Sequence, residues 1–456
     1  MPTHRIRRQI LDLELPRTAG AVELQRQAGR VFREQVLPRL ESVFGKLAPA
    51  DRFIRIDRLE IDLGRIGEAQ WEREFVERCI REIDRQIREA TGTPTASGPT
   101  QAAVVQSPRE HALAIFRYFL ETGRLPWHAG TLSLKILESQ LVEIARTDPT
   151  AVQAAVLPGL KQRPAALRRL VWQFSPAFSN AVIEAALALP GSWIAQALQI
   201  RQNQTGQTVK AEERIAFLQQ LLDNAAIPAQ QPPFPELVAQ LFFQTQPAAD
   251  NPPPPAVKPG VRKKNPPAGT EIRPEKTEIL RLVPDTPADE GIFIDHAGLV
   301  LLGAYLPGFF AELQLTIGPV FRSGEARLRA IHVLHFLATG TEQPEEPALT
   351  LPKLLCGLPL DEPVPPGIEL TPSEKTEAQN LLEAAVRNWP ALKNTSADGL
   401  RTGFLQRQGL LTFQENQNRW LLQIERLGRD MLLERLPWTY SLIKMPWLNT
   451  AIQVEW

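Results

Sequence analysis

The sequence predicts an α+β protein that is predominantly α-helical. Three observations lead to that class. Short amphipathic segments with apolar residues three and four positions apart fill the middle of the chain, which is the period of a helix. Segments that alternate apolar and charged residues, as half-buried strands do, lie near both ends. The 41 prolines among 456 residues, about 9% against a usual 5% or so, stop most segments after a few turns.

The N-terminal segment, residues 1–91, predicts an α+β domain with the order strand, helix, strand, helix. HRIRRQILDLEL, closed by Pro16, is the first strand. FIRIDRLEIDLG (53–64) alternates apolar and charged residues as the second. Its apolar phase changes near Asp57–Arg58, which predicts a bulge there.

The two helices of this segment are residues 20–47 and 71–90. Proline removes a backbone donor, so Pro38 is expected to kink or split the first. The second has an apolar stripe on one side and alternating Glu and Arg on the other. The arginines suit bidentate pairing with carboxylates at an interface, although a solvated helix face explains any single one better.

Residues 92–108 predict a flexible linker of small residues, and residues 109–245 predict an all-helical segment. Seven short amphipathic pieces, most of them opened or closed by Pro, Gly or Asp, follow one another there. Helices of that length in series favour a bundle or a short solenoid rather than one long rod.

Residues 246–290 are rich in proline and low in aromatics, which predicts a disordered, semi-rigid tether. Its basic cluster, Arg262 to Lys264, could contact phosphates. Such clusters more often only keep a linker soluble.

The C-terminal segment, residues 291–456, predicts a mixed α/β domain. It begins strand-like and becomes helical. The helix at 371–389 has a capping box, with Thr371 as N-cap and Glu374 three residues later. Residues 409–426 predict two strands around the turn ENQN, and AIQVEW predicts a terminal strand.

Two helix ends are alike. FRYFLETGRLP (116–126) and VLHFLATGTEQP (333–344) both end in FL-x-TG before a proline. This could reflect duplication, but a common helix stop with glycine at the C-cap is the interpretation that we favour.

The composition excludes several classes of protein. Lys+Arg and Asp+Glu both count 51, so a dedicated nucleic-acid binder, which needs a basic excess, is not expected. We expect neither a signal peptide nor membrane insertion, because no apolar run has the required length. Cys79 and Cys356 are too few for a disulfide framework. A cytoplasmic multidomain protein is predicted.

The sequence contains no recognisable catalytic or metal motif, neither a phosphate loop nor HExxH, GxSxG or CxxC. His332 and His335 could share a metal, but packed helical histidines are far more frequent. Asp295–His296 and Asp361–Glu362 are weaker acid–base candidates. We therefore predict no enzymatic activity, no cofactor and no metal.

The remaining candidates for a functional site are aromatic residues near the end of the sequence. The tail ERLPWTYSLIKMPWLNTAIQVEW holds three of the nine tryptophans. For any one tryptophan, packing into the core is the favoured interpretation. The other is a docking surface, because Trp, Tyr and Met are enriched at interfaces. The candidate interaction residues are Trp438, Trp447, Trp456, Tyr440 and Met445.

A dozen ordered phrases resemble contractile injection system tape measure proteins. They include HRIRRQILDLELP, VLPRLESVFGKLAPADRFIRIDRLEIDLG, FLETGRLPW, IFIDHAGLVLLGAYLP, HFLATG, KLLCGLPLDEPVP, NWPALKNTS, FLQRQG and LPWTYSLIKMPWLNTAIQVEW. The resemblance implies a structural protein of a phage-tail-like particle that sets tube and sheath length. Its implied partners are tube, spike or baseplate proteins, with no nucleic acid, and homo-oligomerisation stays open.

The resemblance also implies a location and leaves two alternatives. The protein is expected within an assembled particle, whether that particle is cytoplasmic, membrane-associated or released. A ruler should be extended, at about 1.5 Å per helical residue, whereas this sequence predicts folded segments. A baseplate or cap adaptor is therefore one alternative. An assembly chaperone that binds tube or cargo proteins is the other.

Overall fold

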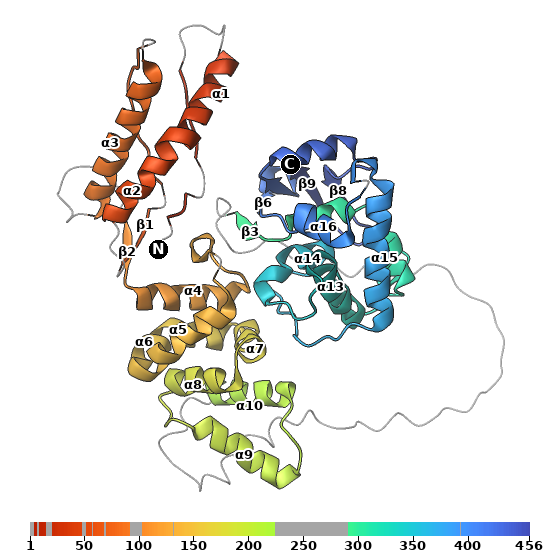
Figure 1. Ribbon diagram of the computed structural model, residues 1–456. Coiled ribbons are helices and arrows are strands. Elements are labelled where there is room, and N and C mark those ends of the chain that lie inside the picture. The colour runs from red at the N-terminus through yellow and green to blue at the C-terminus, as the bar shows by residue number, and fades with distance from the viewer. Residues whose placement is uncertain are drawn as a thin grey trace, which may run out of the picture. The chain divides into compact units, whose positions relative to one another are not determined.

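The structure, a computed structural model, contains two compact units, Met1–Ile115 and Phe116–Trp456 (Figure 1). It is predominantly helical with a small sheet content, as predicted. The predicted tether and residues 224–245 lie outside the described residues, and the predicted domain boundaries stay predictions. The structure describes residues 4–6, 9–14, 21–47, 52–56, 58–67, 70–91, 103–130, 132–223, 291–392 and 394–456.

The first unit is built from helices packed around a small apolar core and a two-stranded ribbon. In the ribbon, Ile54 lies opposite Val105 in antiparallel register. Burial raises the pKa of the Cys79 thiol in the core to about 11. The elements are α1 (Ala21–Val31), α2 (Leu37–Leu47), β1 (Phe53–Arg55), α3 (Trp71–Thr91) and β2 (Val104–Gln106). The core residues are Val31, Phe32, Val36, Leu40, Phe75, Val76, Cys79, Ile83 and Ile87.

The first predicted helix is confirmed, with an interruption. Between α1 and α2, the π-helical turn η1 (Phe32–Val36) lets the Leu37 N–H donate to the Phe32 carbonyl. Pro38 follows at once. It has no N–H, and its ring would clash with the carbonyl of Glu34 four residues earlier. The wider turn relieves that conflict, as the predicted split at Pro38 requires.

The predicted strands of this unit differ from the structure. No strand occurs in the described part of HRIRRQILDLEL, and the second segment is a strand only at β1. β1 pairs with β2, which lies within the expected linker. The side chains still alternate between exposed and half-buried over residues 10–14 and 60–64, with Leu11 and Ile61 packed on the core. The apolar pattern therefore set the buried face, while a ladder also needs a partner strand. The predicted bulge falls partly outside the described residues.

All seven helical pieces predicted in the middle of the chain are confirmed. Ser133, Asp148 and Ser175 are polar N-caps of three of them, and proline occupies the first helical position after Asp148 and Ser175. We call them the helical stack. Its helices are α4 (Pro108–Thr122), α5 (Leu134–Thr147), α6 (Pro149–Gln162), α7 (Pro164–Gln173), α8 (Pro176–Ala186), α9 (Trp193–Thr205) and α10 (Ala211–Asp223).

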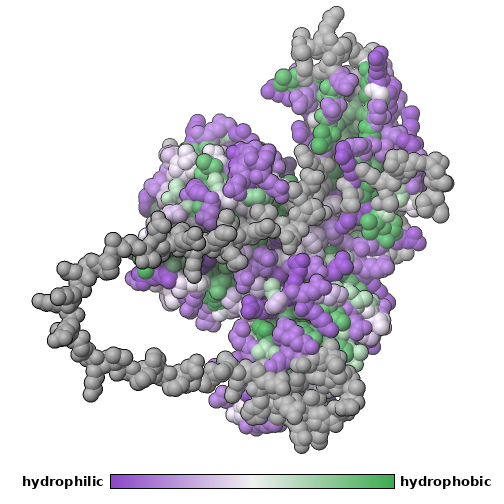
Figure 2. Space-filling model, turned by 180° about the vertical axis from the view of Figure 1, so that it is seen from behind, coloured by the Kyte–Doolittle hydropathy of each residue, from purple (hydrophilic) through white to green (hydrophobic). Residues whose placement is uncertain are grey.

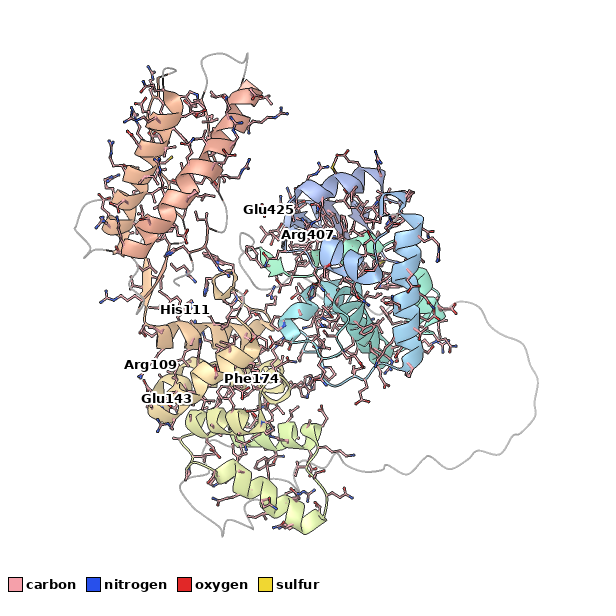
Figure 3. The ribbon with its side chains drawn as sticks, viewed as in Figure 1. Arg109, His111, Glu143, Phe174, Arg407 and Glu425 are labelled. Atoms are coloured by element: carbon pink, nitrogen blue, oxygen red, sulfur yellow. The ribbon has the colours of Figure 1, made fainter. Side chains whose placement is uncertain are left out.

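Aromatic rings fill the centre of this stack. Phe174, labelled in Figure 3, lies edge-on to Phe116 and Phe119, with ring centroids 5.3 and 5.7 Å apart. Phe178 joins them from α8. These rings tie α4, α7 and α8 together.

Residues 291–456, which we call the C-terminal body, contain a five-stranded sheet. The strand order is β3-β6-β7-β9-β8, all antiparallel neighbours except the parallel pair β7 and β9. The predicted strands at 409–426 and at the end of the chain are confirmed. The strands are β3 (Ile292–Ile294), β6 (Gly409–Gln414), β7 (Arg419–Ile424), β8 (Leu442–Ile443) and β9 (Ala451–Glu455), with a separate hairpin of β4 (Thr316–Ile317) and β5 (Val320–Phe321).

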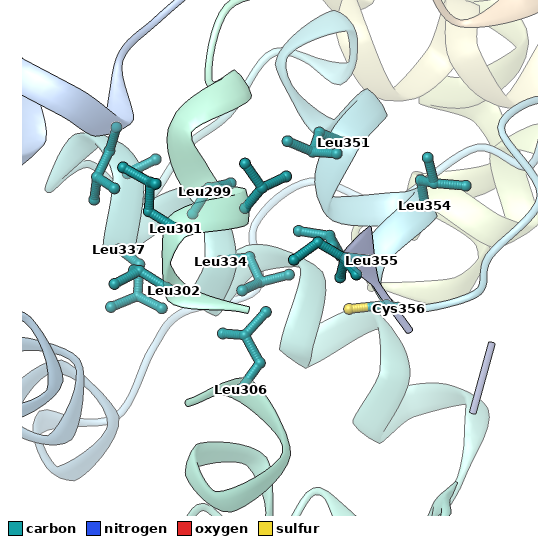
Figure 4. Close-up of a cluster of buried hydrophobic side chains, with 14 of the residues drawn as sticks. Leu299, Leu301, Leu302, Leu306, Leu334, Leu337, Leu351, Leu354, Leu355 and Cys356 are labelled. Carbon is teal, nitrogen blue, oxygen red and sulfur yellow. The ribbon is translucent and has the colours of Figure 1, made fainter. Parts of the chain in front are cut away.

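The helices of the body enclose one large apolar core (Figure 4). In Figure 4, leucines of η4, α13 and α14 converge, and Cys356 lies beside them. The predicted capping box at Thr371 and Glu374 is confirmed. The helices are η4 (Ala297–Leu302), α12 (Leu306–Glu312), α13 (Gly324–Thr339), η5 (Glu346–Leu349), α14 (Thr350–Leu355), α15 (Pro372–Asn388), η6 (Pro390–Leu392), α16 (Ala397–Leu400), η7 (Arg401–Leu405), η8 (Glu415–Gln417) and η9 (Gly428–Arg435).

Candidate interaction site

The five candidate interaction residues lie on and just after one connection. Because β7 and β9 run in parallel, the chain must return across the sheet between them. Trp438, Tyr440, Met445 and Trp447 lie on this crossover, and Trp456 directly follows β9.

The crossover tryptophans donate their indole N–H groups to acceptors within the body. Nε1 of Trp438 donates to the Leu301 carbonyl at 2.8 Å, and Nε1 of Trp447 donates to the Leu355 carbonyl at 2.8 Å. A buried indole N–H needs such a partner, because leaving it unsatisfied costs about 1–3 kcal/mol. These bonds fix the crossover to η4 and α14.

Trp456 is held by a buried carboxylate. Asp430, which is 0% exposed, accepts from Nε1 of Trp456 at 2.9 Å and from both Nη atoms of Arg407 at 2.7 and 2.9 Å. The Leu427 N–H donates to the same carboxylate at 2.7 Å. Burial opposes ionisation, but these hydrogen bonds outweigh it and hold the pKa of Asp430 below its ordinary value.

Arg407 links the Asp430 carboxylate to Glu425, the residue that directly follows β7. In Figure 3 it lies beside Glu425, whose backbone carbonyl accepts from Nη2 of Arg407 at 2.6 Å. The guanidinium carbon is 5.3 Å from the Trp456 ring centroid, in cation–π geometry. Tyr440 lies edge-on to that ring with centroids 6.1 Å apart.

The candidate residues therefore pack into the body, as we favoured for an individual tryptophan. Met445 is 2% exposed, whereas the tryptophans and Tyr440 are half-buried and keep part of their surface accessible. The structure does not bring the three indoles onto one another. Their role in docking stays a prediction.

A second polar cluster was not predicted. Nε of Arg169 is 3.1 Å from Oε1 of Glu346, and Nζ of Lys353 is 2.6 Å from the same oxygen. The three side chains are between 0% and 2% exposed. Nη1 of Arg169 also donates to the Leu120 carbonyl at 2.9 Å, and Nη2 donates to the Asp361 carbonyl. Burial lowers the pKa of Lys353 more than Glu346 raises it.

This ion cluster, Arg169, Glu346 and Lys353, joins the helical stack to the C-terminal body. Arg169 belongs to α7, Glu346 to η5 and Lys353 to α14. Beside it, the Glu346 N–H donates to Oε1 of Gln173 at 3.0 Å. The Leu134 N–H donates to Oε2 of Glu345 at 3.0 Å. One sequence signal existed: Lys353 interrupts an otherwise apolar run, TLPKLLCGL, where a lysine is buried only with a partner.

The two FL-x-TG helix ends share more than a glycine. Gly123 and Gly340 have φ of 72° and 75°, the left-handed conformation expected of a glycine C-cap. Arg169 donates to the leucine carbonyl of the first motif, and Arg401 donates to that of the second at 3.1 Å. The shared helix stop is confirmed, and each copy carries an arginine that caps the last carbonyls.

The acid–base candidates fall in structural positions. His335 packs against His296, with ring centroids 5.7 Å apart, and burial lowers the pKa of His335 to about 4. Burial also lowers the pKa of His332. Asp361 and Glu362 are exposed. Across the described ranges, no group of three or more His, Cys, Asp or Glu side chains is placed to hold a metal ion.

None of the described helices is both long and apolar enough to cross a membrane. The charged and aromatic side chains of the site make their contacts within the chain itself. The family described as contractile injection system tape measure protein matches residues 3–456, so the chain belongs to that family. This confirms the resemblance of the sequence phrases. No curated protein and no solved structure matches the chain. The family is structural rather than catalytic, and its members lie inside the assembled particle.

Proposed function

We propose that this chain is a non-enzymatic assembly protein that sets the tube and sheath length of its particle. The observation that carries the proposal is the family match over residues 3–456, which includes both units. Tube, spike or baseplate proteins of the same particle are the proposed partners. The accessible parts of Trp438, Tyr440, Trp447 and Trp456 are the proposed docking contacts.

The helical stack is the part best suited to measure length. Residues 132–223 are almost entirely helical, and drawn out as one continuous helix they would span up to about 140 Å, at 1.5 Å for each residue. To be drawn out, the stack must leave the C-terminal body. The contacts between them include ion pairs and hydrogen bonds, and water can solvate these groups once the two parts separate.

A second candidate function is a folded adaptor at one end of the particle. The ion cluster favours it, because separating Arg169 from Glu346 leaves buried charges without partners until water reaches them. A chain that stays folded would dock through its surface and would not measure length by its own extension.

Particle length separates the two functions. In the native host, one variant would lack residues 132–223 and another would carry them twice, so that one copy keeps the contact of Arg169 with Glu346. Particle lengths are measured by negative-stain electron microscopy. A ruler predicts tubes shorter and longer by up to about 140 Å.

The control is a Gly/Ser insertion of the same length at residues 246–290. If the particles lengthen with the duplication of residues 132–223 but not with the Gly/Ser insertion, the helical stack sets their length. Lengthening by both insertions assigns the measurement to the total chain. Unchanged lengths in all variants contradict the ruler and leave the adaptor.

A further inference from the structure

The first unit contains two segments with a strand-like pattern and no ladder. Exposed and half-buried side chains alternate over residues 10–14 and from Glu60 through Ile61 to Asp62, which is typical of an extended backbone, while Arg58 and Leu59 are both exposed. None of the backbone–backbone hydrogen bonds between described residues involves either segment. The second segment follows β1 in the chain, and the pairing of β1 with β2 ends at Arg55. Among the described residues, the main-chain donors and acceptors of both segments therefore have no backbone partner.

The inner faces of these segments are anchored. Leu11 packs on the core of the first unit, as do Ile61 and Leu63. Nη1 of Arg78, from α3, donates to the Leu63 carbonyl at 2.6 Å. The segments are therefore held in place from one side, so an incoming strand would find them already ordered.

The outer faces combine apolar and acidic side chains. Ile10, on the outer face of its segment, is 71% exposed, and Leu59, on the same face as Ile61, is still 37% exposed. Asp12, Glu14 and Asp62 are exposed, and the ion pairs of the described residues include none of the three. Figure 2 shows hydrophobic side chains gathered along the first unit between hydrophilic margins. An exposed edge of this composition is a template for pairing with another strand.

We propose that residues 9–14 and 58–62 are a strand acceptor that binds an extended segment of another protein, with apolar residues on one face and Lys or Arg on the other. Main-chain hydrogen bonds would supply affinity, and the alternate side chains would supply specificity. A second copy of this chain is the poorer occupant. Pairing residues 10–14 in full with their own copy, in either direction, would place Asp12 opposite Asp12, which is destabilising.

The proposal rests on the proposed function only in taking the partner to be a protein of the same particle. Its test uses the purified full-length chain, so a failed length experiment would leave it standing. Amide hydrogen exchange is measured alone and with a short synthetic peptide that alternates valine and lysine. Residues 9–14 and 58–62 should exchange rapidly in the free chain and at least tenfold more slowly with the peptide.

Two control peptides separate strand addition from other contacts. One has the same sequence with N-methylated backbone amides, and the other alternates valine and glutamate; neither should slow exchange. Equal slowing by the N-methylated peptide would overturn the proposal, as would slow exchange in the free chain. A lack of slowing with every peptide would also overturn it.

Charge reversal tests the acidic face. Asp12→Lys and Asp62→Lys should each weaken binding of the valine–lysine peptide about two- to fivefold, on the scale of one cross-strand charge pair. The matched control, Glu41→Lys, changes an exposed carboxylate on α2 and should leave binding unchanged. Exchange in α3 serves as the internal reference for folding. Equal effects of all three substitutions would point to net charge alone and reject the acceptor.

Discussion

Glu346 and Arg169 stand 177 residues apart in the chain and form an ion pair from which solvent is excluded on both sides. Lys353 shares the same carboxylate oxygen. A buried ion pair is weak evidence of net stabilisation, because desolvation offsets the attraction. Removing one partner of such a pair is nevertheless costly, because the other charge is left buried without a partner.

Glu346→Gln should destabilise the second unit more than Arg169→Gln does. The first substitution leaves both Arg169 and Lys353 without their carboxylate, whereas the second keeps Lys353 paired. We expect a loss in unfolding free energy of about 3–5 kcal/mol for Glu346→Gln. Urea denaturation followed by tryptophan fluorescence measures it.

Two further variants check the cause. Replacing all three members of the cluster by apolar residues of similar size should recover most of the loss. Arg168→Gln, on the exposed neighbour that lies 3.7 Å from Glu362, should change stability by less than about 1 kcal/mol. A loss with Arg168→Gln as large as with Glu346→Gln would show that burial is not the cause.

Asp430→Ala should lower the free energy of unfolding more than Trp456→Phe does. The phenylalanine keeps the ring over Arg407 and loses one hydrogen bond to Asp430, at a cost of about 1–2 kcal/mol. Asp430→Ala leaves the Arg407 side chain, 7% exposed, without its carboxylate and should cost about 3–5 kcal/mol. Thermal unfolding compares them, with Glu434→Ala, at an exposed ion pair, as the near-neutral control. Equal costs would contradict this assignment.

Gly123→Ala should destabilise the protein more than Gly340→Ala. Both glycines have positive φ, so both alanines carry a strain of about 1 kcal/mol. At Gly123 a Cβ atom would also lie 2.8 Å from Nε of Arg169, within the ion cluster, whereas at Gly340 the nearest atom is 3.7 Å away. Denaturant midpoints measured side by side decide between them. A larger loss at Gly340 would be inconsistent with this crowding.

The C-terminal body should lose stability as the pH falls below about 6.5. Burial lowers the pKa of His335 to about 4, and it also lowers the pKa of His296 and of His332. Between pH 6.5 and 4 the unfolded chain therefore binds protons that the folded chain excludes, so stability rises with pH in this window. For His335 alone the full difference is about 3 kcal/mol, reached near pH 4.

Denaturation curves at pH 7.5 and pH 5 measure this effect. His335→Gln, which does not titrate, should reduce the difference between the two pH values. His4→Gln, in the first unit, is the matched control and should leave it unchanged. An unaltered difference in His335→Gln would assign the pH dependence to other groups.

The sequence predicted the elements that depend on local signals. Pro, Gly or Asp at their ends marked the helices of the stack, and Thr371 with Glu374 marked α15. Hydrophobic periodicity also predicted β6, β7 and β9. These signals act within a few residues, so they survive any arrangement of the rest of the chain.

Pairing over long distances could not be predicted in the same way. Residues 53–64 alternate as a strand should, yet the choice of β2 as the partner of β1 depends on the whole unit. Likewise, Arg169 and Glu346 each resemble an ordinary surface charge until the fold buries them together. Asp430 was hidden for the same reason, although the tryptophan that it holds was singled out.

The order of strands in the C-terminal sheet has a consequence for synthesis. β9 lies between β7 and β8, although both precede it in the chain. Until the ribosome has made residues 451–455, one edge of β7 is unpaired and β8 lacks the strand that it pairs with. A nascent chain halted before Ala451 would leave that edge free to pair with other molecules, so this half of the protein can complete its fold only after β9 has emerged.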